Sequence, residues 1–224
     1  MDQSPAFQEY CATIFELAED GVSVIQARIA ERLAVSRPAV SEMVKRMEGE
    51  RLVTVKGGKV SLTVHGRDLA EKAVRRHRLA ERFLTDVLHL TWADAHGEAG
   101  RWQHVISDKV ELAMFELLGD PTTCPHGNPI PGSSYTAPET RPLSAVAVST
   151  RFVVSRILEE LEFTPGLLEY LERSLLTPGR RGVVTSASPD GTLTVEIDGR
   201  HAGIGAFAAA RILVSADVPA LAGA

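Results

Sequence analysis

The chain has 224 residues, of which 44% are hydrophobic, which suffices for one large domain or two to three small ones. The formal net charge of −5 does not by itself indicate a nucleic-acid partner. No apolar run approaches the roughly 20 residues that span a membrane, and no signal-peptide pattern begins the chain. Cys11 and Cys124 lie far apart, which argues against a disulfide framework and favours a reducing cytoplasm.

The N-terminal quarter predicts two helices and a connecting turn. A leading helix is expected over residues 5–18, and the next helix should bury Ile25, Ile29 and Leu33, which recur at helical spacing. Ser36 then precedes Arg37-Pro38, which suits an N-cap followed by proline in the first turn.

The helix that follows has an apolar side and a polar side. Val40, Val44 and Met47 form the expected core side, whereas the polar side chains face outward, as in a helix that enters a major groove. Two β-rich runs around Gly57-Gly58 predict a hairpin in the position of a wing. A plain helical bundle is the alternative, but the hairpin favours a DNA-binding winged helix. The candidate DNA contacts are Arg28, Ser36, Arg37, Pro38, Ser41, Glu42, Lys45 and Arg46.

The charge of this segment also favours DNA. Residues 27–60 carry eight Lys and Arg against four Glu, a net charge of +4, so the rest of the chain carries −9. A basic patch on an acidic body attracts phosphates, while the body discourages unspecific binding.

Three further helices are expected, over residues 66–90, 92–106 and 108–118, with apolar faces that suit packing within a subunit or across a two-fold axis. His77 and Glu81 are four residues apart and share a face of the first, and His96 and His104 share a face of the second. Imidazole with carboxylate suits a divalent transition metal. A solvated, charged outer face is the alternative for any one of these residues.

The C-terminal part of the sequence has a different residue pattern from the helical part. Residues 138–149 have the composition of a linker, and short β-rich runs separated by Pro-Asp-Gly and Asp-Gly turns follow, with one short helix near residue 167. This pattern predicts a small SH3-like β-barrel.

The chain resembles the DtxR family of iron- and manganese-dependent repressors. The segments that carry the resemblance are ARIAERL (27–33), VSRPAVSEMVKRME (35–48), RRHRLAERFL (75–84), HGEAGRWQHVISDKVE (96–111) and GNPIPG (127–132). The resemblance implies a winged helix-turn-helix domain over 1–72, a helical metal-binding and dimerisation domain over 73–137, and an SH3-like, FeoA-like domain over 150–224. It also implies a homodimer that binds a palindromic operator when Fe(II) or Mn(II) is present.

The resemblance further implies two metal sites and an anion site. His77, Glu81 and His96 match the ancillary metal site, and Arg78, Cys124 and Asn128 match the anion-binding positions. The family also draws ancillary ligands from its third domain, for which Glu160 or Glu162 is close to the expected position. Ser36, Pro38 and Ser41 match DNA contacts, but Glu42 stands where glutamine is frequent, so the operator is expected to differ.

The primary, regulatory site departs from the family pattern. Its positions are Glu9 in the first helix, with Gln8 and Cys11 beside it, and Gly100, Gln103 and His104. Gly100 and Gln103 replace two anionic ligands, so this site should bind metal weakly or not at all.

The sequence therefore predicts a cytoplasmic, homodimeric, metal-dependent regulator, most simply a repressor of metal-homeostasis genes. One alternative is a DNA-binding regulator whose metal sensing is altered or lost. Another is a metalloenzyme that uses His77, Glu81 and His96, although no catalytic motif accompanies these ligands.

Overall fold

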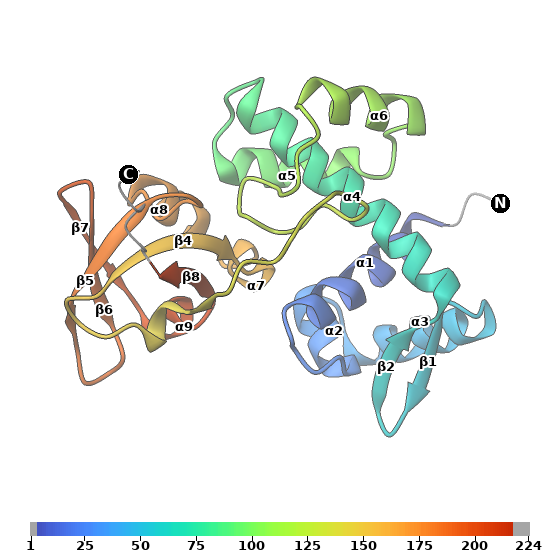
Figure 1. Cartoon of the computed structure of the whole chain (residues 1–224). Helices are drawn as coiled ribbons and strands as arrows, with labels where there is room; N and C mark the ends of the chain where they lie inside the picture. The colour runs from blue at the N-terminus through green and yellow to red at the C-terminus, as the bar shows by residue number, and fades with distance from the viewer. Residues whose placement is uncertain (1–3, 217–224) are drawn as a thin grey trace.

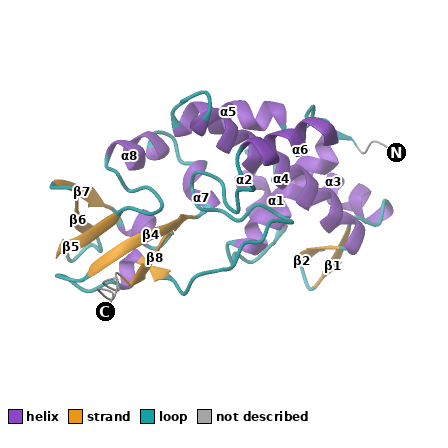
Figure 2. Cartoon of the chain, turned by 45° about the horizontal axis from the view of Figure 1, so that its top comes forward, coloured by secondary structure: helices purple, strands orange, loops and turns teal. Residues whose placement is uncertain are grey.

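The computed structural model describes residues 4–216, which fold into three domains arranged along the molecule (Figures 1 and 2). The N-terminal domain packs α1 (Pro5–Glu19), α2 (Gln26–Arg32) and α3 (Arg37–Gly49) against the hairpin of β1 (Val53–Lys56) and β2 (Lys59–Leu62). β1 and β2 pair antiparallel, with Val55 opposite Val60. This is the expected winged helix-turn-helix, and the hairpin protrudes from the domain in Figure 1.

The core of this domain follows the expected pattern with one exception. Val40, Val44 and Met47 are buried, and Ser36 caps α3 by accepting a hydrogen bond from the backbone of Ala39. Ile25 was expected to be buried but is exposed, because it precedes α2 and forms a β-bridge with the wing residue Lys59.

The central domain is helical. It consists of α4 (Val64–Asp86), α5 (Trp92–Trp102) and α6 (Asp108–Leu117), followed by the loop that contains residues 122–133. α4 is long enough to belong to two domains, since it packs on α1 near its start and on α5 near its end. Side chains on α4 can therefore contact both domains.

The C-terminal domain is a six-stranded antiparallel sheet in the order β3-β8-β4-β5-β6-β7, and Figure 2 shows it at one end of the molecule. The strands and short helices, in chain order, are β3 (Arg141–Pro142), the 3-10 helix η1 (Leu143–Ala145), β4 (Arg151–Ile157), α7 (Glu159–Glu162), α8 (Leu167–Arg173), β5 (Arg181–Ala187), β6 (Leu193–Ile197), β7 (Arg200–Ile204), α9 (Ala206–Ala209) and β8 (Ile212–Ala216).

The start of this domain differs from the expected boundary. β3 pairs with β8, and Leu143 of η1 is buried in the core of the sheet domain. Residues 141–145, which were expected in the linker, therefore belong to the C-terminal domain. α7 and α9 were not expected, because four-residue helices leave no periodic pattern. No helix among residues 4–216 is both long and apolar enough to cross a membrane.

Candidate metal centre

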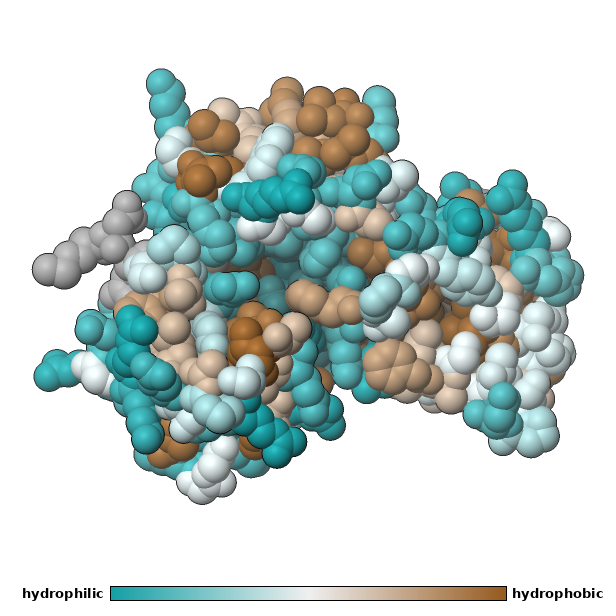
Figure 3. Space-filling view, turned by 180° about the vertical axis from the view of Figure 1, so that it is seen from behind, coloured by the Kyte–Doolittle hydropathy of each residue, from teal (hydrophilic) through white to brown (hydrophobic). Residues whose placement is uncertain are grey.

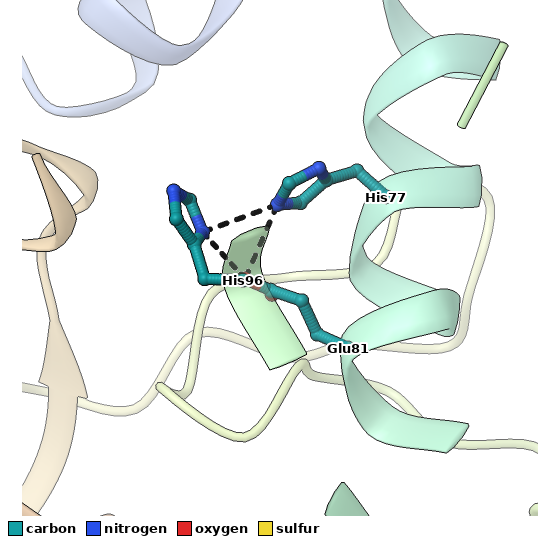
Figure 4. A group of neighbouring side chains, drawn as sticks. All are labelled: His77, Glu81 and His96. Carbon is teal, nitrogen blue, oxygen red and sulfur yellow. Dashed lines mark hydrogen bonds and ion pairs between the residues drawn. The ribbon is translucent and has the colours of Figure 1, made fainter. Parts of the chain in front are cut away.

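His77, Glu81 and His96 meet at a single point inside the protein (Figure 4). His77 and Glu81 come from successive turns of α4, and His96 reaches them from α5. The Nδ1 atom of His96 lies 2.9 Å from Oε1 of Glu81, and the Nε2 atom of His77 lies 3.2 Å from the same oxygen. These three side chains were grouped as a candidate metal site from the sequence, and the fold brings them together.

Three more donors surround this group. Oε2 of Glu162, from α7 in the C-terminal domain, lies 3.1 Å from Nδ1 of His96. Oε1 of Glu162 lies 3.1 Å from Nδ1 of His126, and Cys124 forms a second group of candidate ligands with Glu81 and His126. We call this assembly the buried cluster, and its members are His77, Glu81, His96, Cys124, His126 and Glu162.

The loop of Cys124 and His126 is fixed by the C-terminal domain. The backbone N–H of Ile157 in β4 donates to the carbonyl of His126 at 2.8 Å. Gly127 adopts a positive φ of 86°, and a Cβ there would lie 2.3 Å from the carbonyl oxygen of Ser155. Only glycine allows this close approach, which holds His126 against α4 and α7.

The electrostatics of the buried cluster are strongly perturbed. Burial alone would raise the pKa of Glu81, but His77 and His126 hold it well below its usual value. Glu162 behaves similarly, since His126 outweighs its burial and holds its pKa at about 2. Burial would lower the pKa of His96, yet Glu162 and Glu81 raise it to about 11. Two anionic carboxylates are thus buried among imidazoles.

The donor set fits a divalent transition metal. Both ring nitrogens of His126 and Oε2 of Glu162 are buried and make no hydrogen bond of acceptable geometry, despite close N···O approaches. Buried polar atoms without hydrogen bonds are rare and call for an explanation such as an ion. Imidazole and carboxylate donors that converge in a buried space are the ligands that such ions prefer.

Sequence reasoning missed His126 and did not decide between Glu160 and Glu162. The fold places Glu162 in the buried cluster, whereas Glu160 pairs with Arg211 on the far side of α7. The spacing of Cys124 and His126, two residues apart beside a glycine, is a signal from which His126 could have been found.

The three expected anion-binding residues lie at the junction of the domains. Arg78 is fully buried and binds Glu159 and Glu19 at 2.7 Å each, as well as the carbonyl of Pro129. Burial alone would lower the pKa of Arg78, but the two carboxylates raise it well above its usual value. In this structure the charge of the Arg78 guanidinium, expected to bind an anion, is thus balanced by carboxylates of the protein itself, Glu159 and Glu19.

The other two anion-binding candidates have different partners. Asn128 donates to Glu162 at 2.8 Å and accepts from Arg156, and Arg156 also binds Glu19 and Asp20 at the end of α1. Cys124 belongs to the buried cluster, and burial raises the pKa of its thiol to about 11.

The primary-like residues line a small cavity beside the buried cluster. Glu9, Gly100, Gln103 and His104 surround a space of about 170 Å³. His104 accepts its hydrogen bond from Gln103 and contacts Gln8 of α1 at 3.0 Å, so Gln8, rather than Glu9, lies against His104. Burial lowers the pKa of His104. Cys11 is buried in the hydrophobic core of the N-terminal domain.

The candidate DNA contacts lie on α2, on α3 and at the N-cap of α3. All of them are exposed except Ser41, which is half-buried. Arg28 is paired with Glu31 at 2.8 Å, and the guanidinium of Arg46 lies 5.5 Å from the ring centre of Phe7. The wing carries two further exposed lysines, Lys56 and Lys59.

Family models match all three domains. Residues 2–60 match the N-terminal DNA-binding domain of iron-dependent repressors, residues 63–132 match their metal-binding and dimerisation domain, and residues 141–216 match the FeoA domain. Together with the winged helix and the buried cluster, these matches define a DNA-binding, metal-dependent transcriptional regulator.

Individual proteins similar to this chain are iron- and manganese-dependent repressors. The iron-dependent repressor IdeR of Mycobacterium leprae is 39% identical over 204 residues, which cover 86% of this chain and 88% of that protein. The diphtheria toxin repressor of Corynebacterium diphtheriae is 45% identical over 153 residues, 64% of this chain and 68% of that protein. A manganese-dependent transcriptional repressor solved with manganese superimposes with a TM-score of 0.83 at 32% identity, over 94% of this chain and 99% of that one.

This chain belongs to the DtxR/IdeR family of metal-dependent, DNA-binding transcriptional repressors. The expected fold is confirmed, with the FeoA domain as its SH3-like part. The family consists of repressors, so the metalloenzyme alternative is wrong.

Proposed function

We propose that this chain is a cytoplasmic homodimer that represses metal-homeostasis genes by binding a palindromic operator when Fe(II) or Mn(II) fills the buried cluster. The observation that carries the proposal is the buried cluster itself, in which carboxylates and imidazoles from two domains converge. Both ring nitrogens of His126 and Oε2 of Glu162 are buried there without a hydrogen bond. The named relatives are iron- or manganese-dependent repressors, and nitrogen and oxygen donors suit both metals.

The residues that would hold the metal are divided between two domains. His77, Glu81 and His96 belong to the central helices, whereas Glu162 belongs to the C-terminal domain. A bound dication would neutralise the two buried carboxylates and join the helices to the sheet domain. Since Glu159, three residues before Glu162, binds Arg78 together with Glu19 of α1, a metal that fixes α7 would also fix α1.

A regulator with altered or lost metal sensing is the second candidate. It is favoured by Gly100 and Gln103, which provide no anionic side chain at the primary-like site. The two candidates differ in whether a chelator changes the affinity for DNA.

The DNA-binding part of the proposal has a direct test in Arg46, which is exposed on α3. If its guanidinium contacts phosphate, Arg46→Ala should weaken binding to every duplex alike and should reduce the slope of log K against log salt by about one. Fluorescence anisotropy over a salt series with Mn(II) measures both quantities. Arg200→Ala, an exposed arginine on β7, is the matched control and should behave as wild type. An unchanged slope for Arg46→Ala would remove Arg46 from the interface.

The surface of the central domain supports self-association. Figure 3 shows apolar side chains gathered along the upper edge of the molecule, over the helical domain. Val105 is 78% exposed and Leu117 is 66% exposed, and further exposed apolar residues near them in the sequence are Val87, Leu88, Val110 and Leu112. Apolar patches of this kind mark interaction sites, and a two-fold dimer would bury the same patch on both chains.

We expect Leu112→Glu with Leu117→Glu to break the dimer, because burying two charges per chain in an apolar interface is strongly unfavourable. Light scattering should report a dimer for the wild type and a monomer for the variant at micromolar concentration. Glu116→Gln, an exposed polar position on the same helix, is the control and should remain dimeric. A monomeric wild type, with and without metal, would contradict the proposed assembly.

A further inference from the structure

A row of three hydrogen bonds connects the buried cluster with the first helix of the DNA-binding domain. Nδ1 of His77 lies 2.9 Å from Oε1 of Gln103, and Nε2 of Gln103 lies 3.1 Å from Nε2 of His104. Nδ1 of His104 lies 3.0 Å from Oε1 of Gln8 in α1. We call these four side chains the glutamine relay.

The chemistry of the amide groups fixes the direction of every bond in the row. An amide oxygen only accepts and an amide nitrogen only donates. His77 must therefore donate from Nδ1 to Gln103, Gln103 must donate to Nε2 of His104, and His104 must donate from Nδ1 to Gln8. All three bonds are satisfied by neutral imidazoles that carry their proton on Nδ1.

This arrangement leaves Nε2 of His77 as the atom with a free lone pair, and Nε2 is the atom that faces Glu81 and His96 in the buried cluster. A histidine that coordinates through one nitrogen needs a hydrogen-bond acceptor at the other, because this partner fixes the tautomer and orients the ring. The carbonyl of Gln103 supplies that acceptor.

We infer that Gln103 is a positioning residue that holds His77 ready to coordinate through Nε2 and connects this ligand, through His104 and Gln8, to the DNA-binding domain. The inference rests on the proposed metal centre. It assigns the primary-like residues Gln103 and His104 a role as hydrogen-bonding side chains in place of metal ligands.

The relay depends on glutamine at position 103. A glutamate there accepts only, so it could receive the bond from His77 but could not donate to Nε2 of His104. Gly100 leaves the neighbouring space open, since a Cβ at that position would meet no atom within 4 Å. No side chain from position 100 therefore competes with Gln103 for either histidine.

Occupancy of the buried cluster should strengthen the relay. A dication on Nε2 of His77 excludes a proton from that nitrogen, so the ring keeps its proton on Nδ1 and donates to Gln103. Metal would thereby fix the tautomer on which the bond to Gln103 depends, and with it the row that ends at Gln8 in α1.

The test compares the full-length wild type with Gln103→Met, Gln8→Leu and the control Arg101→Met, an exposed residue on the same helix as His96. Metal affinity is measured by calorimetry with Mn(II), and DNA affinity by anisotropy with Mn(II) and with chelator. Gln103→Met should lose about tenfold to 100-fold in metal affinity, as expected for an outer-shell partner. In Gln8→Leu the metal affinity should stay within a few-fold of the wild type. The factor by which Mn(II) strengthens DNA binding should fall at least about fivefold.

A second measurement needs no variant. Nitrogen-15 spectra of the histidine rings with Zn(II) bound as a diamagnetic probe should report His104 as the Nδ1–H tautomer. Wild-type metal affinity in Gln103→Met, an unchanged metal effect in Gln8→Leu, or an Nε2–H tautomer for His104 would each overturn the relay. A wild type that binds no metal would overturn the proposed metal centre as well, so the two failures are distinguishable.

Discussion

Replacing His77 and His96 together by alanine should abolish tight metal binding. The wild type is expected to bind one divalent ion per chain, and the double variant should lose more than about 100-fold in affinity, beyond what loss of an outer-shell hydrogen bond costs. The reason is geometric, because the two imidazoles converge with Glu81 and supply two of the three donors of that group. Calorimetry with Mn(II) measures the affinity and the stoichiometry.

The matched control is a double variant of histidines outside the buried cluster. His89 and His201 are exposed, and alanine at both positions should leave metal binding unchanged. Wild-type affinity in the His77/His96 variant would contradict the proposed ligand set. Two tight ions in the wild type would instead mean that the primary-like residues coordinate metal without the anionic side chains they lack.

Arg78→Met should destabilise the fold by about 3–5 kcal/mol, the usual effect of removing one partner from a buried ion pair. Arg78 is fully buried and pairs with Glu159 and Glu19 from the two outer domains. Its loss leaves Glu159 buried without a counter-charge, and the carboxylate there already has its pKa raised to about 7 by burial and by Glu162. Urea unfolding in chelator measures the free energy without a contribution from metal binding.

Two further variants show whether the loss of stability comes from the buried ion pairs of Arg78 or follows from removing any arginine. Arg180→Met removes an exposed pair with Asp198 and should cost no more than about 1 kcal/mol. Adding Glu159→Leu to Arg78→Met should recover part of the loss, since the unpaired carboxylate is then gone. A loss for Arg78→Met no greater than that for Arg180→Met would show that the junction contributes little to stability.

The sequence sufficed for the winged helix and the central helices because their signals are local. Apolar spacing, the Ser36 cap and the Gly57-Gly58 turn each fall within a few residues of the structure they specify. His77, Glu81 and His96 could be grouped for the same reason, since two of them lie on successive turns of one helix face.

The remaining members of the buried cluster could not be deduced in this way. Glu162 reaches the site only because β4 and α7 dock on the loop of His126, and no local pattern encodes contact between residues so far apart. Glu9 and Gln8 are adjacent in sequence, so only the rotation of α1 decides which of them contacts His104. Domain docking and helix rotation are tertiary properties, which explains why both assignments required the structure.

If metal in the buried cluster controls DNA binding, removing the metal should weaken the complex with the operator. The wild type is titrated onto a duplex that carries its palindromic site, at fixed salt, once with Mn(II) and once with an excess of chelator. We expect Mn(II) to strengthen binding by at least about fivefold, the lower end of typical coupling between two sites. Equal affinity in both solutions would contradict the account and would leave a DNA-binding protein that has lost metal control.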